Sequence, residues 1–124
     1  MNHILKKYCP RIEFDSYEDF YENFKIDVPE AFNFGFDVVD EWARVEPEKR
    51  ALVWCDDRDE ERTFTFADLS RLSNQAANAF AKLGIGKGDV VMMILRRRWE
   101  YWVCAVALCK LGAVMIPATA QLLP

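Results

Sequence analysis

The sequence predicts an α/β fold, arranged as a partial parallel-sheet sandwich with a crossover helix. Residues 90–95 are six apolar residues without polar alternation, which is typical of a strand buried on both faces of a parallel sheet. Residues 99–111 then form a largely apolar helix candidate, and residues 113–116 form a second apolar strand candidate. Strand, helix and strand make one crossover unit, which is expected to be right-handed.

The chain divides into two parts by composition. Residues 1–30 are rich in acidic and aromatic side chains and are predicted to form an N-terminal arm. Within this arm, Ser16 is a candidate N-cap for a helix whose aromatic residues recur at helical spacing as far as Phe24, with Pro29 as its stop. We favour an arm packed on the rest of the fold, and an aromatic patch that binds a partner is the alternative. Residues 31–124 are predicted to form an incomplete α/β subdomain.

Two elements are predicted at the start of this subdomain. Asn33 is a candidate cap for a helix that Pro47 closes. Residues 51–55 and 62–65 predict a β-hairpin. The acidic connector 56–61 is interpreted as a solvated turn, in preference to a metal site.

An amphipathic helix is predicted after Thr65, because Thr65 and Asp68 have the spacing of a capping box and apolar residues then recur on one face. Gly84 is expected to end this helix. The glycines of residues 84–88 invite comparison with a phosphate-binding loop, but such a loop follows a strand and opens a helix. These glycines follow a helix and open a strand, so they are interpreted as a cap and a tight turn.

Composition excludes several classes of protein. The chain has 124 residues with 16 basic and 20 acidic side chains, and this net charge of −4 argues against nucleic-acid binding. Its longest apolar run without a charge or a glycine, residues 101–109, is far shorter than the roughly 20 residues of a membrane span. No secretory signal and no zinc-type cysteine spacing are present, so we expect a cytoplasmic protein with four reduced thiols, at Cys9, Cys55, Cys104 and Cys109.

Two arginines are the candidate binding residues. Arg96 and Arg97 follow the strand at residues 90–95, and ligands of open parallel sheets lie beyond the carboxyl ends of the strands. A guanidinium group there suits a phosphate or a carboxylate, and the alternative is a solvated charge patch. No catalytic residue and no metal ligand is predicted. The two apolar strands also leave an open sheet edge, which predicts self-association or a longer parent protein.

The chain contains three stretches, in order, that match the motifs of a known family. They are Thr65-Phe-Ala-Asp-Leu69, Leu83-Gly-Ile-Gly-Lys-Gly-Asp-Val-Val91 and Leu108-Cys-Lys-Leu-Gly-Ala-Val-Met-Ile-Pro117. They resemble the start of the AMP-forming acyl-CoA synthetases, also called the adenylate-forming superfamily, although Leu111 stands where alanine is frequent. Residues 33–42 and 99–102 are most similar to the medium-chain and short-chain acyl-CoA synthetase or acetyl-CoA synthetase branch.

The resemblance implies that the chain is the first part of the large N-terminal domain of an adenylate-forming ligase. Such an enzyme joins a carboxylic acid to ATP, releasing pyrophosphate, and the thiol of coenzyme A (CoA) then displaces AMP to give the acyl-CoA. It requires ATP, Mg²⁺ and CoA. The family's phosphate loop, ribose-binding acid and mobile lysine have no counterpart here, so the chain alone is expected to be inactive and to hold no cofactor. A non-catalytic module that binds a partner through its sheet edge, and an enzyme that loads a carrier protein, are the alternatives.

Overall fold

The computed structural model of the chain describes residues 3–122. The chain forms two compact units, Met1–Phe32 and Asn33–Pro124. The assignment of residues 1–30 to an arm and of residues 31–124 to an incomplete subdomain stays a prediction.

The first unit contains two short helices, α1 (His3–Tyr8) and α2 (Tyr17–Asn23). The predicted cap is confirmed, because Ser16 Oγ accepts a hydrogen bond from the Asp19 N–H group at 3.1 Å. The predicted stop at Pro29 is wrong. The backbone turns extended at Phe24, with φ −68° and ψ 124°, so α2 ends before any proline is reached.

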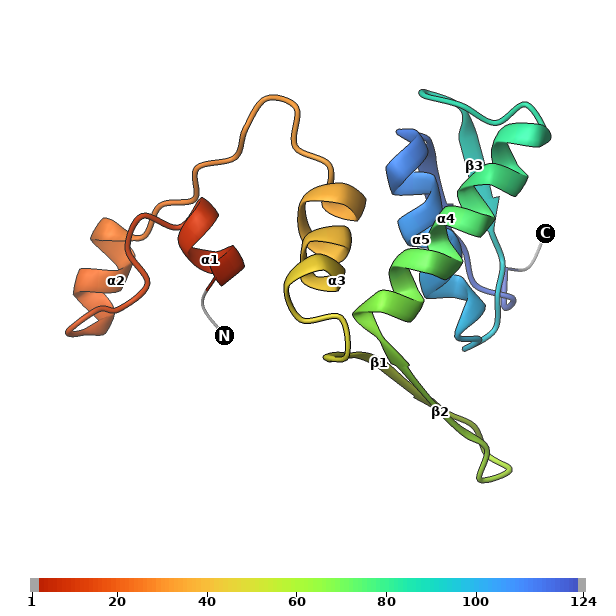
Figure 1. Cartoon of the computed structure of the whole chain (residues 1–124), viewed down its shortest axis with the longest axis horizontal. Helices are drawn as coiled ribbons and strands as arrows, with labels where there is room; N and C mark the ends of the chain where they lie inside the picture. The colour runs from red at the N-terminus through yellow and green to blue at the C-terminus, as the bar shows by residue number, and fades with distance from the viewer. Residues whose placement is uncertain (1–2, 123–124) are drawn as a thin grey trace. The chain divides into compact units, whose positions relative to one another are not determined.

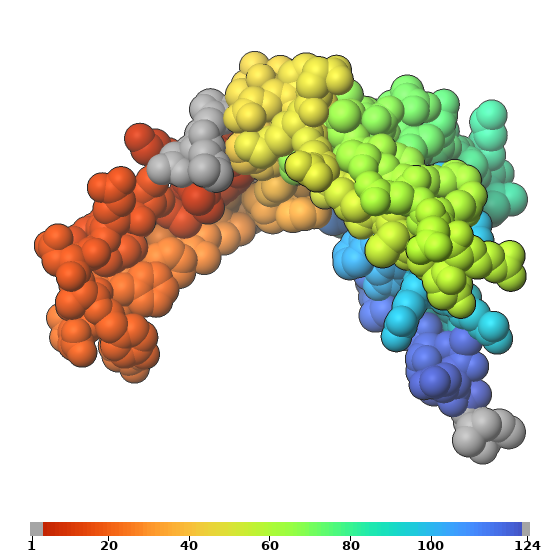
Figure 2. All heavy atoms as spheres, turned by 90° about the horizontal axis from the view of Figure 1, so that it is seen from below, coloured from red at the N-terminus to blue at the C-terminus, as the bar shows by residue number. Residues whose placement is uncertain are grey.

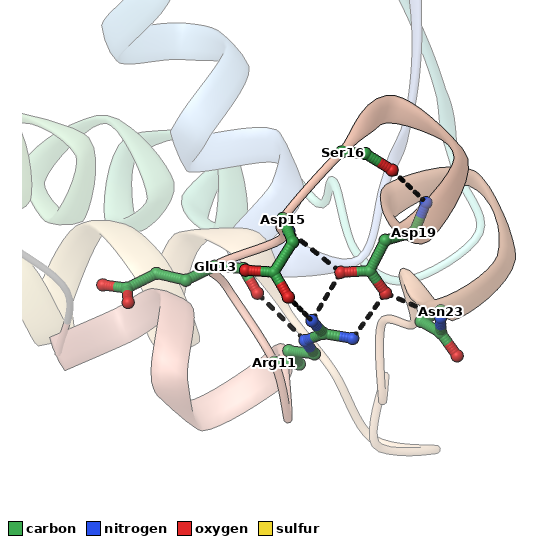
Figure 3. Close-up of polar contacts among 6 residues, drawn as sticks. All are labelled: Arg11, Glu13, Asp15, Ser16, Asp19 and Asn23. Atoms are coloured by element: carbon green, nitrogen blue, oxygen red, sulfur yellow. Dashed lines mark hydrogen bonds and ion pairs between the residues drawn. The ribbon is translucent and has the colours of Figure 1, made fainter.

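Asp19 holds this unit together through its carboxylate (Figure 3). Arg11 donates to both of its oxygens, at 2.7 and 2.5 Å, and Asn23 Nδ2 donates at 2.8 Å. The backbone N–H group of Asp15 donates at 3.0 Å. The pKa of Asp19 is lowered, mainly by this hydrogen bond from Asp15 and next by the hydrogen bond from Arg11. The loop before α2 is therefore fastened to the first turn of the helix.

Aromatic side chains pack along α2. Phe14 meets Phe20 edge to face at 5.3 Å between ring centres, and Phe20 stacks on Phe24 at 4.9 Å. Tyr17 and Tyr21 are 72% and 76% exposed, so they lie outside this cluster. The favoured packing of the arm on the rest of the fold stays a prediction, and so does the alternative of an aromatic patch for a partner.

The second unit opens with the helical segment expected after Asn33. It consists of η1 (Gly35–Asp40), which is π-helical, and α3 (Glu41–Val45). Asn33 Oδ1 accepts a hydrogen bond from the Gly35 N–H group at 2.9 Å, so the predicted cap is confirmed. The wide π-helical turn was not predicted, because apolar residues spaced three and four apart fit either helix type.

The hairpin and the amphipathic helix follow as predicted. Strands β1 (Arg50–Cys55) and β2 (Glu61–Thr65) pair antiparallel, with Leu52 opposite Phe64. Helix α4 (Phe66–Lys82) begins with a complete capping box between Thr65 and Asp68. The connector forms a turn in which Asp56 Oδ1 accepts two backbone hydrogen bonds at 2.9 Å. Across residues 3–122, no group of three or more potential ligands from His, Cys, Asp and Glu gathers around a metal position.

The crossover unit is also present. Strand β3 (Val90–Met93), helix α5 (Glu100–Leu111) and strand β4 (Val114–Pro117) follow in sequence, and the two strands pair in parallel. Gly112 ends α5 with a φ of 71°, a left-handed conformation that glycine adopts without strain. Within the described part of the chain, no helix is both long enough and apolar enough to span a membrane.

The predicted cover on both faces of the first parallel strand is wrong. Met93 is only 6% exposed, but Val90 and Met92 are 61% and 56% exposed. Side chains of successive strand residues point to opposite faces, so one face of β3 is open. The strand also ends at Met93, and Ile94 and Leu95 belong to the following loop. An apolar run indicates that a strand will be covered, but it does not identify the covering segment.

The core of the second unit lies between η1, α4 and α5. Its buried members are Val39, Leu69, Val103 and Val106. Helices α4 and α5 pack against each other, as Figure 1 shows, and both also contact η1. In the space-filling view the yellow spheres of α3 adjoin the green spheres of α4 (Figure 2). In Figure 1 the hairpin extends away from these helices.

Candidate functional site

The two predicted arginines lie in the loop between β3 and α5, beyond the carboxyl end of β3. Both are exposed. This loop is fastened to the hairpin, because Trp54 Nε1 donates a hydrogen bond to the Arg97 carbonyl oxygen at 2.6 Å. The ring of Trp99 packs on Phe64 of β2, with 5.0 Å between ring centres, and adds a second contact.

A cavity of about 430 Å³ opens where the loop meets β1. We call it the aromatic pocket. Its lining includes Val53, Trp54, Leu95, Arg97, Tyr101 and Trp102. Arg97 therefore lines the pocket, whereas Arg96 is not part of its wall. The predicted pair of arginines is divided between the pocket and the open surface.

The charges around the pocket differ in their partners. Arg98, which also lines it, forms hydrogen bonds to both oxygens of Glu100, at 2.7 and 3.2 Å. These bonds raise the pKa of Arg98 and lower the pKa of Glu100. The guanidinium of Arg97 has no hydrogen-bond or ion-pair partner within residues 3–122. The pocket therefore presents one free positive charge against an apolar and aromatic lining.

The aromatic walls were missed by the sequence analysis. Tyr101 and Trp102 lie at the start of the helix that follows the arginines. This closeness in sequence could have predicted that they line the same site. Trp54 gave none, because its role depends on a contact with a residue 43 positions away. Patterns within a strand do not show which distant loop will pack against it.

The four cysteines are free thiols in the structure. Cys55 is exposed and lies at the aromatic pocket. Cys104 lies within α5, where burial, with the nearby Glu100 carboxylate as a smaller cause, raises the pKa of its thiol. A raised pKa keeps Cys104 protonated and poorly nucleophilic near neutral pH.

The glycines of residues 84–88 have the topology that was predicted for them. They follow α4 and precede β3. The Gly88 N–H group donates to the Gly112 carbonyl oxygen at 3.0 Å, which joins this turn to the end of α5. The turn therefore connects two elements of the scaffold, and its Gly88 N–H group is occupied by this bond.

A second cavity of about 430 Å³ is lined by residues that include Phe36, Asn74, Asn78 and Lys110. Lys110 Nζ donates to Asp40 Oδ1 at 2.6 Å and to Asn74 Oδ1 at 2.7 Å. Its charge is already paired inside the protein. This cavity offers no free charge comparable with that of Arg97.

Comparison with known proteins places this geometry in a family. The family described as AMP-binding enzyme matches residues 39–124. The chain is 38% identical over 115 residues to mouse acyl-coenzyme A synthetase ACSM3, mitochondrial, which covers 88% of this chain and 20% of that protein. It is 39% identical over 101 residues to human acyl-coenzyme A synthetase ACSM5, mitochondrial, covering 77% of this chain and 17% of that protein. The chain thus spans about a fifth of the length of these relatives.

Solved structures agree with the sequence relatives. A fatty acyl CoA synthetase of Mycobacterium tuberculosis superposes with a TM-score of 0.65 and 31% identity, covering 73% of this chain and 17% of that chain. A fatty acid AMP ligase from Legionella pneumophila shares the fold, with a TM-score of 0.65, 21% identity, and coverage of 71% of this chain and 16% of its own. The predicted fold class is confirmed. With the family match extending over residues 39–124, the chain belongs to the AMP-binding enzyme family of AMP-forming acid–thiol ligases, which includes the acyl-CoA synthetases.

Proposed function

We propose that this chain is the N-terminal scaffold of an AMP-forming acyl-CoA ligase that uses acetate or a short-chain or medium-chain fatty acid. The whole enzyme would convert the carboxylate, ATP and CoA into acyl-CoA, AMP and pyrophosphate through an acyl-adenylate. The family match over residues 39–124 carries this proposal. The crossover unit of β3, α5 and β4 supports it, because it forms part of that matched region.

The described residues do not fit the reactive centre itself. Adenylate formation requires cationic groups and a metal ion to stabilise the charge that develops around phosphorus. No carboxylate cluster suited to Mg²⁺ is found within residues 3–122, and the glycine turn precedes a strand. We therefore assign no catalytic step to this part of the chain. Its contribution is to position the elements on which the rest of a ligase is built.

Arg96 and Arg97 are proposed as contacts for a phosphate or a carboxylate. Arg97 has the stronger support, since it lines the aromatic pocket and its guanidinium has no partner among the described side chains. Arg96 lies in the same loop, outside the pocket wall. Arg97→Ala in a ligase carrying this segment is expected to raise the KM for the acid or for CoA, and Arg96→Ala is the matched comparison.

A chimera tests the proposed function. Residues 33–122 would replace the matching segment of the mouse relative, and acyl-CoA formation would be assayed with acids from acetate to decanoate. We expect a folded chimera that retains activity. A chimera that is folded and binds ATP, yet forms no acyl-adenylate with any of these acids, would contradict the proposal.

The isolated chain provides the complementary test. We expect no ATP–pyrophosphate exchange above background, because residues 3–122 contain no cluster of carboxylates suited to the Mg²⁺ that the reaction needs. Exchange catalysed by the purified 124-residue chain would show that the reactive groups lie within it.

A non-catalytic partner-binding module is the second candidate function. The observation that favours it is the open face of the two-stranded parallel sheet, where Val90, Met92, Val114 and Ile116 are each at least 41% exposed. Such a surface also supports self-association of the chain. Light scattering on the wild type and on Met92→Lys would test self-association through this face. We expect an oligomer for the wild type and a monomer for the variant. A monomeric wild type at high concentration would contradict it.

Two finer points stay proposals. A carrier-protein thiol is the alternative acceptor to CoA, and parallel assays of a complete ligase with each acceptor would distinguish them. A cytoplasmic location is proposed from the sequence, whereas the curated relatives described above carry the word mitochondrial in their names. Imaging of a fluorescent fusion to the complete protein would decide the location.

A further inference from the structure

We propose that the aromatic pocket is a docking site for the carboxyl terminus of an extended peptide whose last side chain is apolar. The peptide would add a strand beside β1, place its final side chain against the aromatic walls and give its terminal carboxylate to Arg97. This inference needs neither ATP nor CoA, although it assigns the peptide carboxylate to the same Arg97 that is proposed above as a contact for the acid or for CoA.

The first support is the way in which the pocket meets β1. It contacts Val53, Trp54 and Cys55, which are consecutive residues of one strand. Val53 and Cys55 lie on the same face of the strand, with Trp54 between them. The pocket therefore follows β1 over three residues.

The second support is that one edge of β1 is unpaired. Strand β1 pairs with β2 alone in a two-stranded sheet. Within residues 3–122, the backbone groups of Val53 and Cys55 on the side away from β2 make no hydrogen bond to protein. A strand edge of this kind can bind an extended peptide by adding one strand through main-chain hydrogen bonds.

The third support is the charge of the pocket. Arg98 is neutralised by Glu100, which leaves the guanidinium of Arg97 as the free charge of the lining. One guanidinium matches the single negative charge of a carboxylate and can bind it through two parallel hydrogen bonds.

The fourth support is that the walls are held in place before any ligand arrives. The Trp54 indole is fixed by its bond to the Arg97 carbonyl oxygen at 2.6 Å. Trp99 is not part of the wall, but it follows Arg98 in the chain and fixes this end of the loop, because its ring packs on Phe64 and lies 5.6 Å from the Arg62 guanidinium. Tyr101 and Trp102 meet edge to face at 5.2 Å. A cavity of about 430 Å³ is within the usual size range for small-ligand pockets.

Synthetic peptides test this inference on the whole chain. The probe is acetyl-Val-Thr-Val-Phe with a free carboxyl terminus, and the matched control is the same peptide with a carboxamide terminus. Binding would be followed by NMR of the tryptophan indole N–H signals in ¹⁵N-labelled protein. We expect the signals of Trp54 and Trp102 to shift, while Trp42 of α3 serves as the internal reference. The carboxamide peptide should bind about tenfold more weakly, because it lacks the charge that Arg97 recognises.

Two matched variants locate the charge that is responsible. Arg97→Gln should weaken binding of the free-acid peptide by about tenfold and remove the preference over the carboxamide. Arg96→Gln should change neither, since Arg96 is outside the pocket wall. Arg97→Lys keeps the positive charge but loses the planar guanidinium, so its affinity for the free-acid peptide should lie between those of the wild type and Arg97→Gln. This variant provides the measurement if Arg97→Gln folds poorly.

Several results would overturn the proposal. Equal binding of the two peptides, or equal effects of the Arg96 and Arg97 variants, would exclude carboxylate recognition by Arg97. Binding of sodium benzoate or AMP as tightly as the peptide would show a small-molecule site without strand addition. A peptide in which proline replaces threonine should bind more weakly if a strand is added, and unchanged binding would contradict the use of the β1 edge.

Discussion

Lys110 Nζ lies 2.6 Å from Asp40 Oδ1, and this contact joins α5 to the end of η1 inside the second unit. The lysine side chain is only 2% exposed, whereas that of Asp40 is 28% exposed. Ser70 Oγ of α4 donates to the same carboxylate oxygen at 2.6 Å, and Asn74 accepts from the lysine. Three helical segments therefore share one polar network beside the apolar core.

The difference in exposure predicts an asymmetry between the two partners. Asp40→Ala leaves a buried ammonium without its counter-charge and is expected to lower the free energy of unfolding by about 3 kcal/mol. Lys110→Met leaves a carboxylate that still has Ser70 and solvent, so a smaller loss of about 1 kcal/mol is expected. Urea denaturation of the two variants measures this directly.

The double variant is the control for this pair. Combining Asp40→Ala with Lys110→Met removes both charges, so it should be more stable than Asp40→Ala alone. Additive losses would show that the two side chains do not interact in solution. A larger loss for Lys110→Met than for Asp40→Ala would contradict the order that the two exposures predict.

Gly35 makes room for the same lysine. A Cβ atom at this position would stand 2.5 Å from Lys110 Cγ and 3.2 Å from Asn33 Oδ1. Gly35→Ala should therefore push the lysine stem aside and cost about 2 kcal/mol of stability. Gly86→Ala is the matched control, since its Cβ would meet nothing closer than Asp89 Oδ2 at 4.0 Å. Equal stabilities of the two variants would show that the close approach at Gly35 is relaxed in solution.

Local signals explain which parts of the fold were predictable. The start of α4 was correct because Thr65 and Asp68 cap the helix through contacts three residues apart. The place of Arg97 beyond a strand was correct because an apolar run and a following helix mark that strand from the sequence alone. Both inferences depend on neighbours along the chain.

Long-range contacts explain what was missed. Asp40 and Lys110 are 70 positions apart, and nothing in an apolar helix marks its one lysine as buried. The wall that Trp54 gives to the aromatic pocket depends on how the hairpin meets a distant loop. The cover of β3 was wrong for the same reason, because the apolar character of Val90 and Met92 does not specify which segment packs on them.

The bond from Trp54 to the Arg97 carbonyl oxygen should protect the loop from proteolysis. Trp54→Phe removes the donor, and loss of one hydrogen bond of about 1 kcal/mol should raise local opening roughly fivefold. Trypsin should then cleave after Arg96, Arg97 or Arg98 about five times faster, as measured by mass spectrometry. Trp102→Phe removes an indole that makes no hydrogen bond among the described residues, and it should leave the rate near that of wild type.

The capping box predicts a loss of stability in acid. The Thr65 N–H and hydroxyl groups donate to Asp68 Oδ2 at 3.2 and 3.1 Å. The pKa of Asp68 is lowered below its usual value of 3.8, mainly by the hydrogen bond from the Thr65 N–H group and next by the hydrogen bond from Arg71. The unfolded chain therefore binds a proton at Asp68 more readily than the folded chain does. This contribution to stability is complete above pH 3.8 and is lost as the pH falls through the folded pKa.

Asp68→Asn should flatten this part of the stability profile. We expect the wild type to lose more of its free energy of unfolding between pH 5 and pH 3 than the variant does, in urea titrations at each pH. Asp57→Asn is the matched control, because Asp57 lies in the exposed connector and makes no hydrogen bond among residues 3–122. If Asp57→Asn flattens the profile as much as Asp68→Asn does, the acid sensitivity comes from overall charge and not from the cap of α4.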